Sequence, residues 1–248
     1  MSRVSRPAAL LFDFGGTLDC PSHWLDRFVS HYRSSGFAIE RAELDPAFSH
    51  ATEAGYRVSK RLEKFSLLEL VRFLVGQQWE YLRSQGPEGY REMISAMAPR
   101  ARFDAVEKIS ESFVRETSQG MRRNTGVLAK LSESYKIGVV SNWYGNLETI
   151  LTEAGMRKFV RAVGDSSRLG AFKPDPAIFS KTLAMLRVEP GAAAMVGDSM
   201  LKDCVPAHRL GMRTVLLRVE GATVAAQESD FAPDYTIRSL DELLNFRW

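Results

Sequence analysis

Four short apolar runs, each ending at a polar or glycine residue, constrain the fold of this chain most. They cover residues 8–12, 137–140, 192–196 and 214–217, and they end at Asp13, Ser141, Gly197 and Arg218. Runs of this length and setting are typical of strands buried on both faces. Helical patterns follow at residues 146–154, 176–186 and 201–210, then a weak strand at 235–237 and a last helix at 240–246. This alternation predicts an α/β fold, with a Rossmann-like parallel sheet.

Residues 20–123 show no buried-strand pattern and have helical periodicity instead. Asp45-Pro46 favours a helix start, because proline is well accepted at the first helical position. Ser66 and Glu69 form a capping-box pattern before an apolar helical face. Asn124 is expected to be the N-cap of a helix that rejoins the sheet. We therefore predict a core domain of residues 1–19 and 124–248, with an all-helical cap domain of residues 20–123 inserted into it.

The composition of the 248 residues is that of an ordinary globular chain, with 45% hydrophobic and 25% charged residues, which excludes a disordered or fibrous protein. The 33 basic and 30 acidic residues give a net charge of +3, and no basic run with interleaved aromatics occurs, so no nucleic-acid partner is expected. No apolar run reaches the length of about 18 residues that would indicate a membrane helix. Two cysteines exclude a disulfide framework, so we expect a reducing, cytoplasmic location.

Polar side chains follow the predicted strands. Asp13 begins the segment DFGGTL, Ser141-Asn142 follows the second run, and Asp198 and Asp203 follow the third, while Lys173 lies in the loop segment GAFKPDP. Ligands of open parallel sheets bind at the carboxyl ends of the strands, so we expect these groups to share one edge of the sheet.

Phosphoryl transfer is the chemistry that such a set of groups favours. A carboxylate can attack phosphorus and form an aspartyl-phosphate. Mg²⁺, which prefers oxygen ligands, would offset the repulsion between carboxylate and phosphate. Lys173 and loop N–H groups would hold the transferring oxygens.

With these four motifs in this order and a helical insertion after the first, the chain resembles the haloacid dehalogenase (HAD) superfamily of hydrolases, and the insertion resembles its C1-type cap. The resemblance implies that Asp13 is the nucleophile. It implies that Ser141, with Asn142, and Lys173 bind phosphate. It also implies a Mg²⁺ site formed by Asp13, the main-chain carbonyl of Gly15 and Asp198, with Asp203 as a further acid at the metal.

One position departs from the family pattern. Family phosphatases carry a second aspartate two residues after the nucleophile, and it protonates the leaving group and then deprotonates water. Here that position is Gly15, which cannot transfer protons. Loss of a general acid/base lowers rates by about 10²–10⁴-fold, so we expect a slow enzyme unless another group, such as Asp19 or His23, replaces it.

The leading interpretation is a Mg²⁺-dependent phosphatase acting on a small phosphorylated metabolite. Two alternatives remain open at this point. One is a metal-free dehalogenase, in which the aspartate attacks carbon. The other is a phosphate-binding protein that has lost turnover, which Gly15 favours and the complete set of Asp13, Lys173 and Asp198 disfavours. The sequence indicates neither the substrate nor the oligomeric state.

Overall fold

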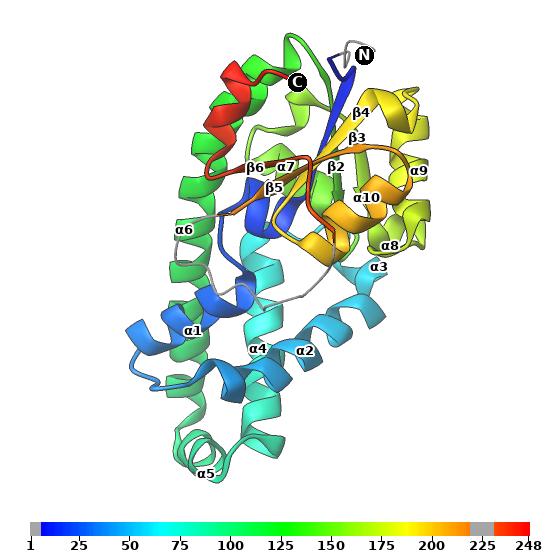
Figure 1. Cartoon of the computed structure of the whole chain (residues 1–248). Helices are drawn as coiled ribbons and strands as arrows, with labels where there is room; N and C mark the ends of the chain where they lie inside the picture. Colours follow the sequence, from blue (N-terminus) through cyan, green and yellow to red (C-terminus); the bar gives the residue numbers. More distant parts are fainter. Residues whose placement is uncertain (1–5, 219–230) are drawn as a thin grey trace. The chain divides into compact units, whose positions relative to one another are not determined.

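The computed structural model describes residues 6–218 and 231–248, and its chain divides into two compact units (Figure 1). The α/β unit comprises residues up to Ser22 and from Ser118 onward, and the helical unit comprises His23–Thr117. The sequence placed these two divisions after residues 19 and 123. Each unit is described by itself below.

A parallel sheet forms the centre of the α/β unit. Within the described residues it has six strands in the order β3-β2-β1-β4-β5-β6. The strands are β1 (Ala9–Phe12), β2 (Lys136–Ser141), β3 (Val160–Asp165), β4 (Ala193–Gly197), β5 (Arg213–Leu217) and β6 (Tyr235–Ile237). The predicted α/β class and parallel sheet are confirmed. The sequence analysis did not predict β3, which forms an edge of the sheet.

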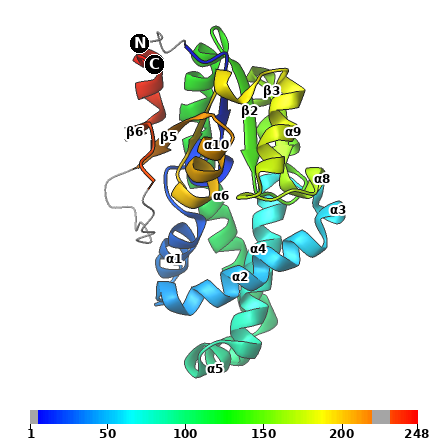
Figure 2. The ribbon, with the colours of Figure 1, turned by 45° about the vertical axis from the view of Figure 1, so that its right-hand side comes forward.

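Helices cover both faces of this sheet (Figures 1 and 2). Helices α9 (Pro176–Leu186) and α10 (Val205–Arg209) pack on one face, where Phe179, Leu183 and Ala207 join Leu11 and Met195 in an apolar core. Further helical segments of the unit are α7 (Leu147–Glu153), α8 (Ser166–Leu169), the second part of α6 (Pro99–Ser132) and the helical turns Phe14–Leu18, Arg157–Phe159, Pro190–Ala192, Met200–Cys204 and Leu240–Asn245.

The single helix predicted over residues 201–210 is wrong in one respect. It is a helical turn, Met200–Cys204, followed by the short helix α10. Ser199 causes the turn, because its Oγ accepts the N–H of Lys202 at 3.2 Å and its carbonyl oxygen accepts the N–H of Asp203 at 3.0 Å. This tight turn brings the carboxylate of Asp203 close to that of Asp198.

The helical unit contains α1 (Trp24–Ser34), α2 (Arg41–Arg57), α3 (Ser59–Leu62), α4 (Leu67–Gln85), α5 (Glu88–Ala96) and the first part of α6 (Pro99–Ser132). The predicted capping box begins α4, where Ser66 Oγ accepts the N–H of Glu69 and Glu69 Oε2 accepts the N–H of Ser66. The predicted helix start at Asp45-Pro46 is wrong. Helix α2 begins at Arg41, where Glu43 Oε2 accepts the N–H of Glu40 at 2.8 Å, and Pro46 lies inside the helix.

Asn124 is not an N-cap. It lies inside α6, whose 34 residues run from the helical unit into the α/β unit. Its buried side chain donates from Nδ2 to the carbonyl oxygen of Leu18 at 2.9 Å. Asn124 thus connects α6 by a hydrogen bond to Leu18, at the end of the turn after β1.

Replacing either of two glycines of α6 by alanine should change the stability of the protein in opposite directions. A Cβ at buried Gly120 would collide with the carbonyl oxygen of Asp19, whereas a Cβ at exposed Gly126 would meet no atom within 4 Å. Gly120→Ala should therefore lower the free energy of unfolding by about 1–3 kcal/mol through overpacking. Gly126→Ala should raise it by up to about 1 kcal/mol, the difference in helix propensity. Urea denaturation of both variants would measure this, and changes of the same sign would contradict it.

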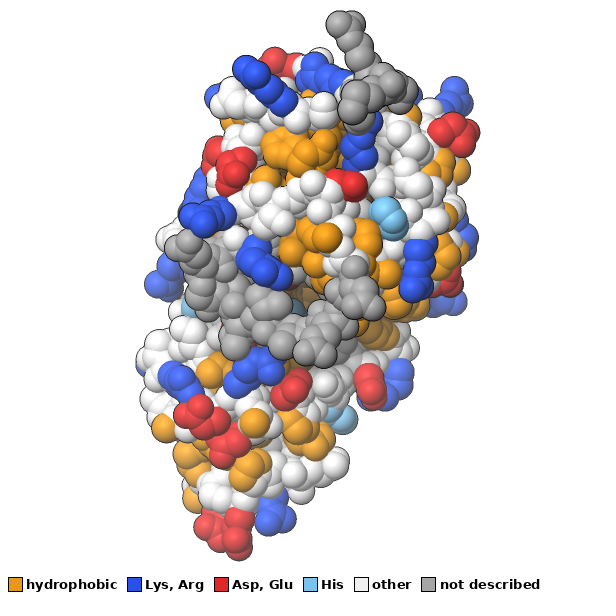
Figure 3. Space-filling view, viewed as in Figure 1, with side chains coloured by type: hydrophobic (Ala, Val, Ile, Leu, Met, Phe, Trp, Pro, Cys, Tyr) orange, Lys and Arg blue, Asp and Glu red, His pale blue; other side chains and the backbone are white. Residues whose placement is uncertain are grey.

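Charged side chains of both signs are interspersed on the face shown in Figure 3. In the part of the chain that the structure describes, no helix has the length and apolar character needed to cross a bilayer.

Candidate active site

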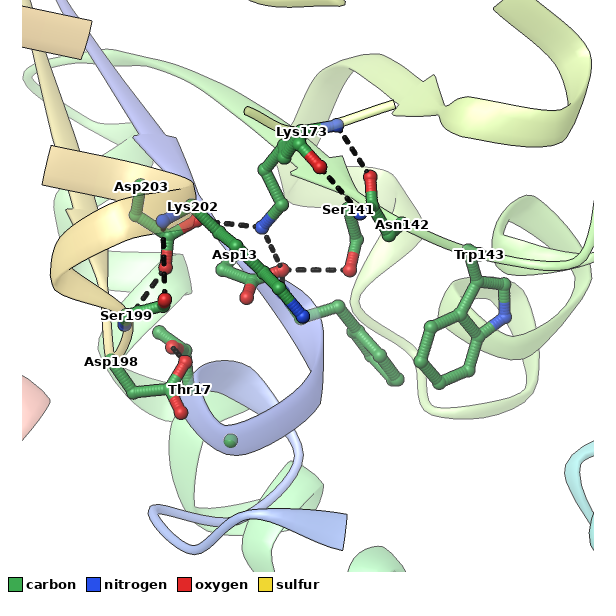
Figure 4. A network of polar contacts seen from close by, with 12 residues as sticks. Asp13, Thr17, Ser141, Asn142, Trp143, Lys173, Asp198, Ser199, Lys202 and Asp203 are labelled. Carbon is green, nitrogen blue, oxygen red and sulfur yellow. Dashed lines mark hydrogen bonds and ion pairs between the residues drawn. The ribbon is translucent and has the colours of Figure 1, made fainter. Parts of the chain in front are cut away.

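The carboxyl ends of the central strands bring distant parts of the sequence together (Figure 4). Asp13 follows β1, Ser141 ends β2, and Asp198 follows β4, while β1 is paired in register with both β2 and β4. Lys173 joins them from the loop before α9. The structure thus assembles the side chains that the sequence predicted to share one edge.

One carboxylate oxygen of Asp13 is held by three donors. Oδ1 accepts hydrogen bonds from the main-chain N–H of Phe14 at 2.6 Å and from Ser141 Oγ at 2.7 Å, and Lys173 Nζ lies 2.8 Å away. Oδ2 has no hydrogen-bond partner within the described residues. The carboxylate is therefore fixed through one oxygen, and the other oxygen is available for chemistry.

Lys173 joins two acids. Its buried Nζ lies 2.8 Å from Asp13 Oδ1 and 2.6 Å from Asp203 Oδ1. Burial disfavours the ammonium ion, but the two carboxylates outweigh this effect and raise the pKa of Lys173 above its usual value. Lys173 therefore remains charged across the physiological range.

Asn142 uses its side chain to hold Lys173. Its Nδ2 donates to the carbonyl oxygen of Lys173 at 2.9 Å, and its Oδ1 accepts the N–H of Lys173 at 2.7 Å. The structure therefore places the Asn142 amide on the Lys173 main chain, where it positions the lysine.

Three carboxylates gather at the site. Ligand atoms from Asp13, Asp198 and Asp203 all lie within 4.8 Å of one another. Burial, followed by the negative charges of Asp13 and Asp203, raises the pKa of Asp198 to about 8. Burial also raises the pKa of Asp203, although Lys173 opposes it. The cluster therefore holds more acidic groups than its one lysine can pair with, and Asp198 keeps its proton more readily than an ordinary aspartate.

Two glycines leave room for these acids. Gly16 has a φ of 84°, and a Cβ on it would collide with the carboxylate of Asp198. A Cβ on Gly197 would collide with the carboxylate of Asp203. The close packing of Asp203 against Gly197 was not predictable from a strand-end glycine alone.

Gly15 lies in the turn after Asp13 with φ −71° and ψ 122°, a conformation open to any L-residue. The two candidates to replace the missing acid/base have structural contacts. Buried Asp19 accepts the N–H groups of Gly16 and Cys20 through Oδ1, at 2.8 and 2.6 Å. His23 caps α1, where its Nδ1 accepts the N–H of Leu25 at 3.2 Å. These contacts favour structural roles for both residues.

Asp165 is a supporting residue that the sequence analysis missed. It ends β3 and is fully buried, and its carboxylate accepts the N–H groups of Gly145, Leu147 and Ser167 at 3.0–3.2 Å. It thereby holds the loop that follows Ser141. The signal was present as Gly164-Asp165 after an apolar pair, and it was missed together with the strand.

Comparisons with known proteins agree with this geometry. A family model described as HAD-hydrolase-like matches residues 171–243. The haloacid dehalogenase-like hydrolase domain-containing protein 3 of Mus musculus is 30% identical over 222 residues, covering 88% of this chain and 84% of that protein. The glyceraldehyde 3-phosphate phosphatase of Methanopyrus kandleri is 35% identical over 96 residues, covering 38% of this chain and 41% of that protein.

A solved dehalogenase structure with an intermediate complex is similar in fold. It has a TM-score of 0.62 and 17% identity, and the match covers 97% of each chain. Since the mouse relative matches along most of both sequences, and since the four motifs meet at one edge of the sheet, the chain belongs to the haloacid dehalogenase-like hydrolases.

Proposed function

We propose that this hydrolase is a Mg²⁺-dependent phosphatase that acts on a small phosphorylated metabolite through an aspartyl-phosphate at Asp13. The observation that carries the proposal is the excess of acids at the site. Three carboxylates lie within 4.8 Å of one another, and Lys173 is the cation paired with two of them. Such a cluster needs a further positive charge before it can accept a phosphate.

The donor set fits a magnesium ion. Mg²⁺ is bound by hard oxygen ligands, and the cluster offers carboxylate oxygens only. Asp13 and Asp198 would hold it, with the Gly15 carbonyl as the family resemblance implies. Both oxygens of Asp203 are engaged, one with Lys173 Nζ and one with the N–H of Ser199, so we assign Asp203 to positioning Lys173. When bound, the metal supplies charge compensation for the carboxylates and the phosphoryl oxygens.

The proposed reaction begins at the Asp13 carboxylate. One of its oxygens attacks phosphorus, the bond between phosphorus and the leaving oxygen breaks, and the phosphoryl group remains on Asp13. Lys173 keeps the carboxylate oriented through Oδ1, and the Ser141 hydroxyl can rotate from Asp13 to a phosphoryl oxygen. Water then attacks phosphorus, which releases inorganic phosphate and restores the carboxylate.

Proton transfer is the weak step in this scheme. The leaving oxygen must gain a proton and the attacking water must lose one, but Gly15 stands where the family carries an aspartate. Asp19 and His23 have the structural contacts described above. We therefore propose that turnover is slow with poor leaving groups.

Similar proteins with different activities define what the test must separate. The Methanopyrus kandleri relative is a glyceraldehyde 3-phosphate phosphatase, and the similar solved structure is a dehalogenase. Aryl phosphate and 2-haloacid substrates should be assayed with Mg²⁺ and with a chelator, for the wild type and for Asp13→Asn. We expect phosphate release that requires Mg²⁺ and Asp13, with no halide release. Metal-independent halide release would establish the dehalogenase instead, and phosphate binding without turnover would establish the binding protein.

A further inference from the structure

Lys202 is a cation next to the site whose side chain takes no part in the contacts among Asp13, Ser141, Lys173 and Asp203. It lies in the turn Met200–Cys204 that connects Asp198 with Asp203, and its N–H donates to Ser199 Oγ at 3.2 Å. Its side chain is exposed, and in the view of Figure 4 it crosses Asp13. Its ammonium group has no ion-pair partner within the described residues.

The charge balance of the site leaves a role for such a group. The two ion pairs of Lys173 are with Asp13 and Asp203, and a divalent cation would bring these residues, with Asp198, to neutrality. A phosphomonoester then adds about −1.5 to −2 charges at pH 7. Lys173 is fixed by its buried contacts with two acids, so a further cation would help to offset the additional negative charge.

We propose that Lys202 is a phosphoryl-binding residue, whose ammonium group contacts a non-bridging oxygen of the substrate phosphate. This inference rests on the proposed phosphatase function. The main chain of Lys202 is held by Ser199, whereas its long side chain is exposed and can turn from solvent to the ligand. Lys202 therefore gives the site a cation that responds to the ligand, beside the fixed Lys173.

The test measures binding of orthovanadate and inorganic phosphate to the Mg²⁺-loaded protein by calorimetry. In Lys202→Gln we expect about tenfold weaker binding of both anions, the size of one lost charge-assisted hydrogen bond at an accessible site. Lys202→Arg keeps the charge and should bind nearly as the wild type does. Arg209→Gln is the matched control, because Arg209 is an exposed cation of the neighbouring α10, and its removal changes the net charge equally.

The outcomes separate this inference from the function on which it rests. Wild-type affinity in Lys202→Gln would overturn the role of Lys202, and so would an equal loss in Arg209→Gln, which would indicate a long-range charge effect. Mg²⁺ affinity should be unchanged in Lys202→Gln, since Lys202 is not one of the clustered carboxylates. A wild type that binds neither anion with Mg²⁺ would overturn the proposed phosphatase itself.

Discussion

Gly15→Asp should hydrolyse aryl phosphates about 10²–10⁴-fold faster than the wild type, the usual contribution of a general acid/base. The variant places a carboxylate where family phosphatases carry one. The backbone tolerates it, because Gly15 has φ −71° and ψ 122°, and the left-handed conformation belongs to Gly16 instead. Steady-state kinetics with leaving groups of increasing pKa would measure the gain, which should be largest for the poorest leaving group.

The control for this variant is Gly15→Asn, which has nearly the same size and shape but no carboxylate. It should show no gain, and both variants should keep the thermal midpoint of the wild type. With an acyl phosphate, which needs no protonated leaving group, the wild type should accumulate phosphorylated Asp13 as a burst. A rapid wild type without a burst, beside a folded Gly15→Asp with no gain, would show that another residue supplies the proton.

Asp198→Asn should weaken Mg²⁺ binding by more than about 100-fold. Loss of a residue that only supports a metal ligand already costs up to about 100-fold, and Asp198 is proposed as a ligand itself. It should also stabilise the metal-free protein at pH 8. The reason is that burial and the charges of Asp13 and Asp203 disfavour the ionised Asp198 carboxylate. Metal affinity and metal-free stability should thus change in opposite directions.

The pH dependence follows from the direction of this shift. The pKa of Asp198 is about 8 in the folded protein, above the usual value of 3.8. Between these values the folded state holds a proton that the unfolded state has lost. The free energy of unfolding should therefore fall as pH rises through this range, by at most about 1.4 kcal/mol per pH unit for one proton.

In Asp198→Asn this fall should be reduced, so that the two stability curves converge toward pH 4 and separate toward pH 8. Urea denaturation in the presence of a chelator would measure it. Glu189→Gln, which removes an exposed carboxylate, is the control and should follow the wild-type curve. Parallel curves for wild type and Asp198→Asn would contradict the argument.

The strands that could be predicted from sequence are those with a continuous apolar run. β1 and β4 are buried along their whole length between neighbours on both sides. β3 lies at the edge of the sheet, where exposed Arg161 interrupts its apolar residues, and its pattern lacks both a run and a clear alternation. The prediction that Asn124 is a helix N-cap was wrong because its hydrogen-bond partner, the Leu18 carbonyl oxygen, is distant in the sequence.

The site residues were predictable because each follows a recognisable strand or lies in a family motif. Their contacts were not. Nothing local in the sequence shows that the Asn142 amide binds the Lys173 main chain, or that Asp203 occupies the space a Gly197 side chain would need. Such contacts depend on the positions of loops about thirty residues apart or on a tight turn, which composition and spacing do not determine.

The contact between Gly120 and Asp19 has a consequence for the modularity of the chain. Asp19 lies just before the chain leaves the α/β unit, and Gly120 lies just after it returns. The exit and the re-entry are therefore adjacent in space, and the whole helical unit is inserted at a single point. A short linker from Ser22 to Ser118 could close that point, and Ser118 is a residue type suited to begin the shortened helix. The insertion could thus be removed or exchanged without interrupting a strand.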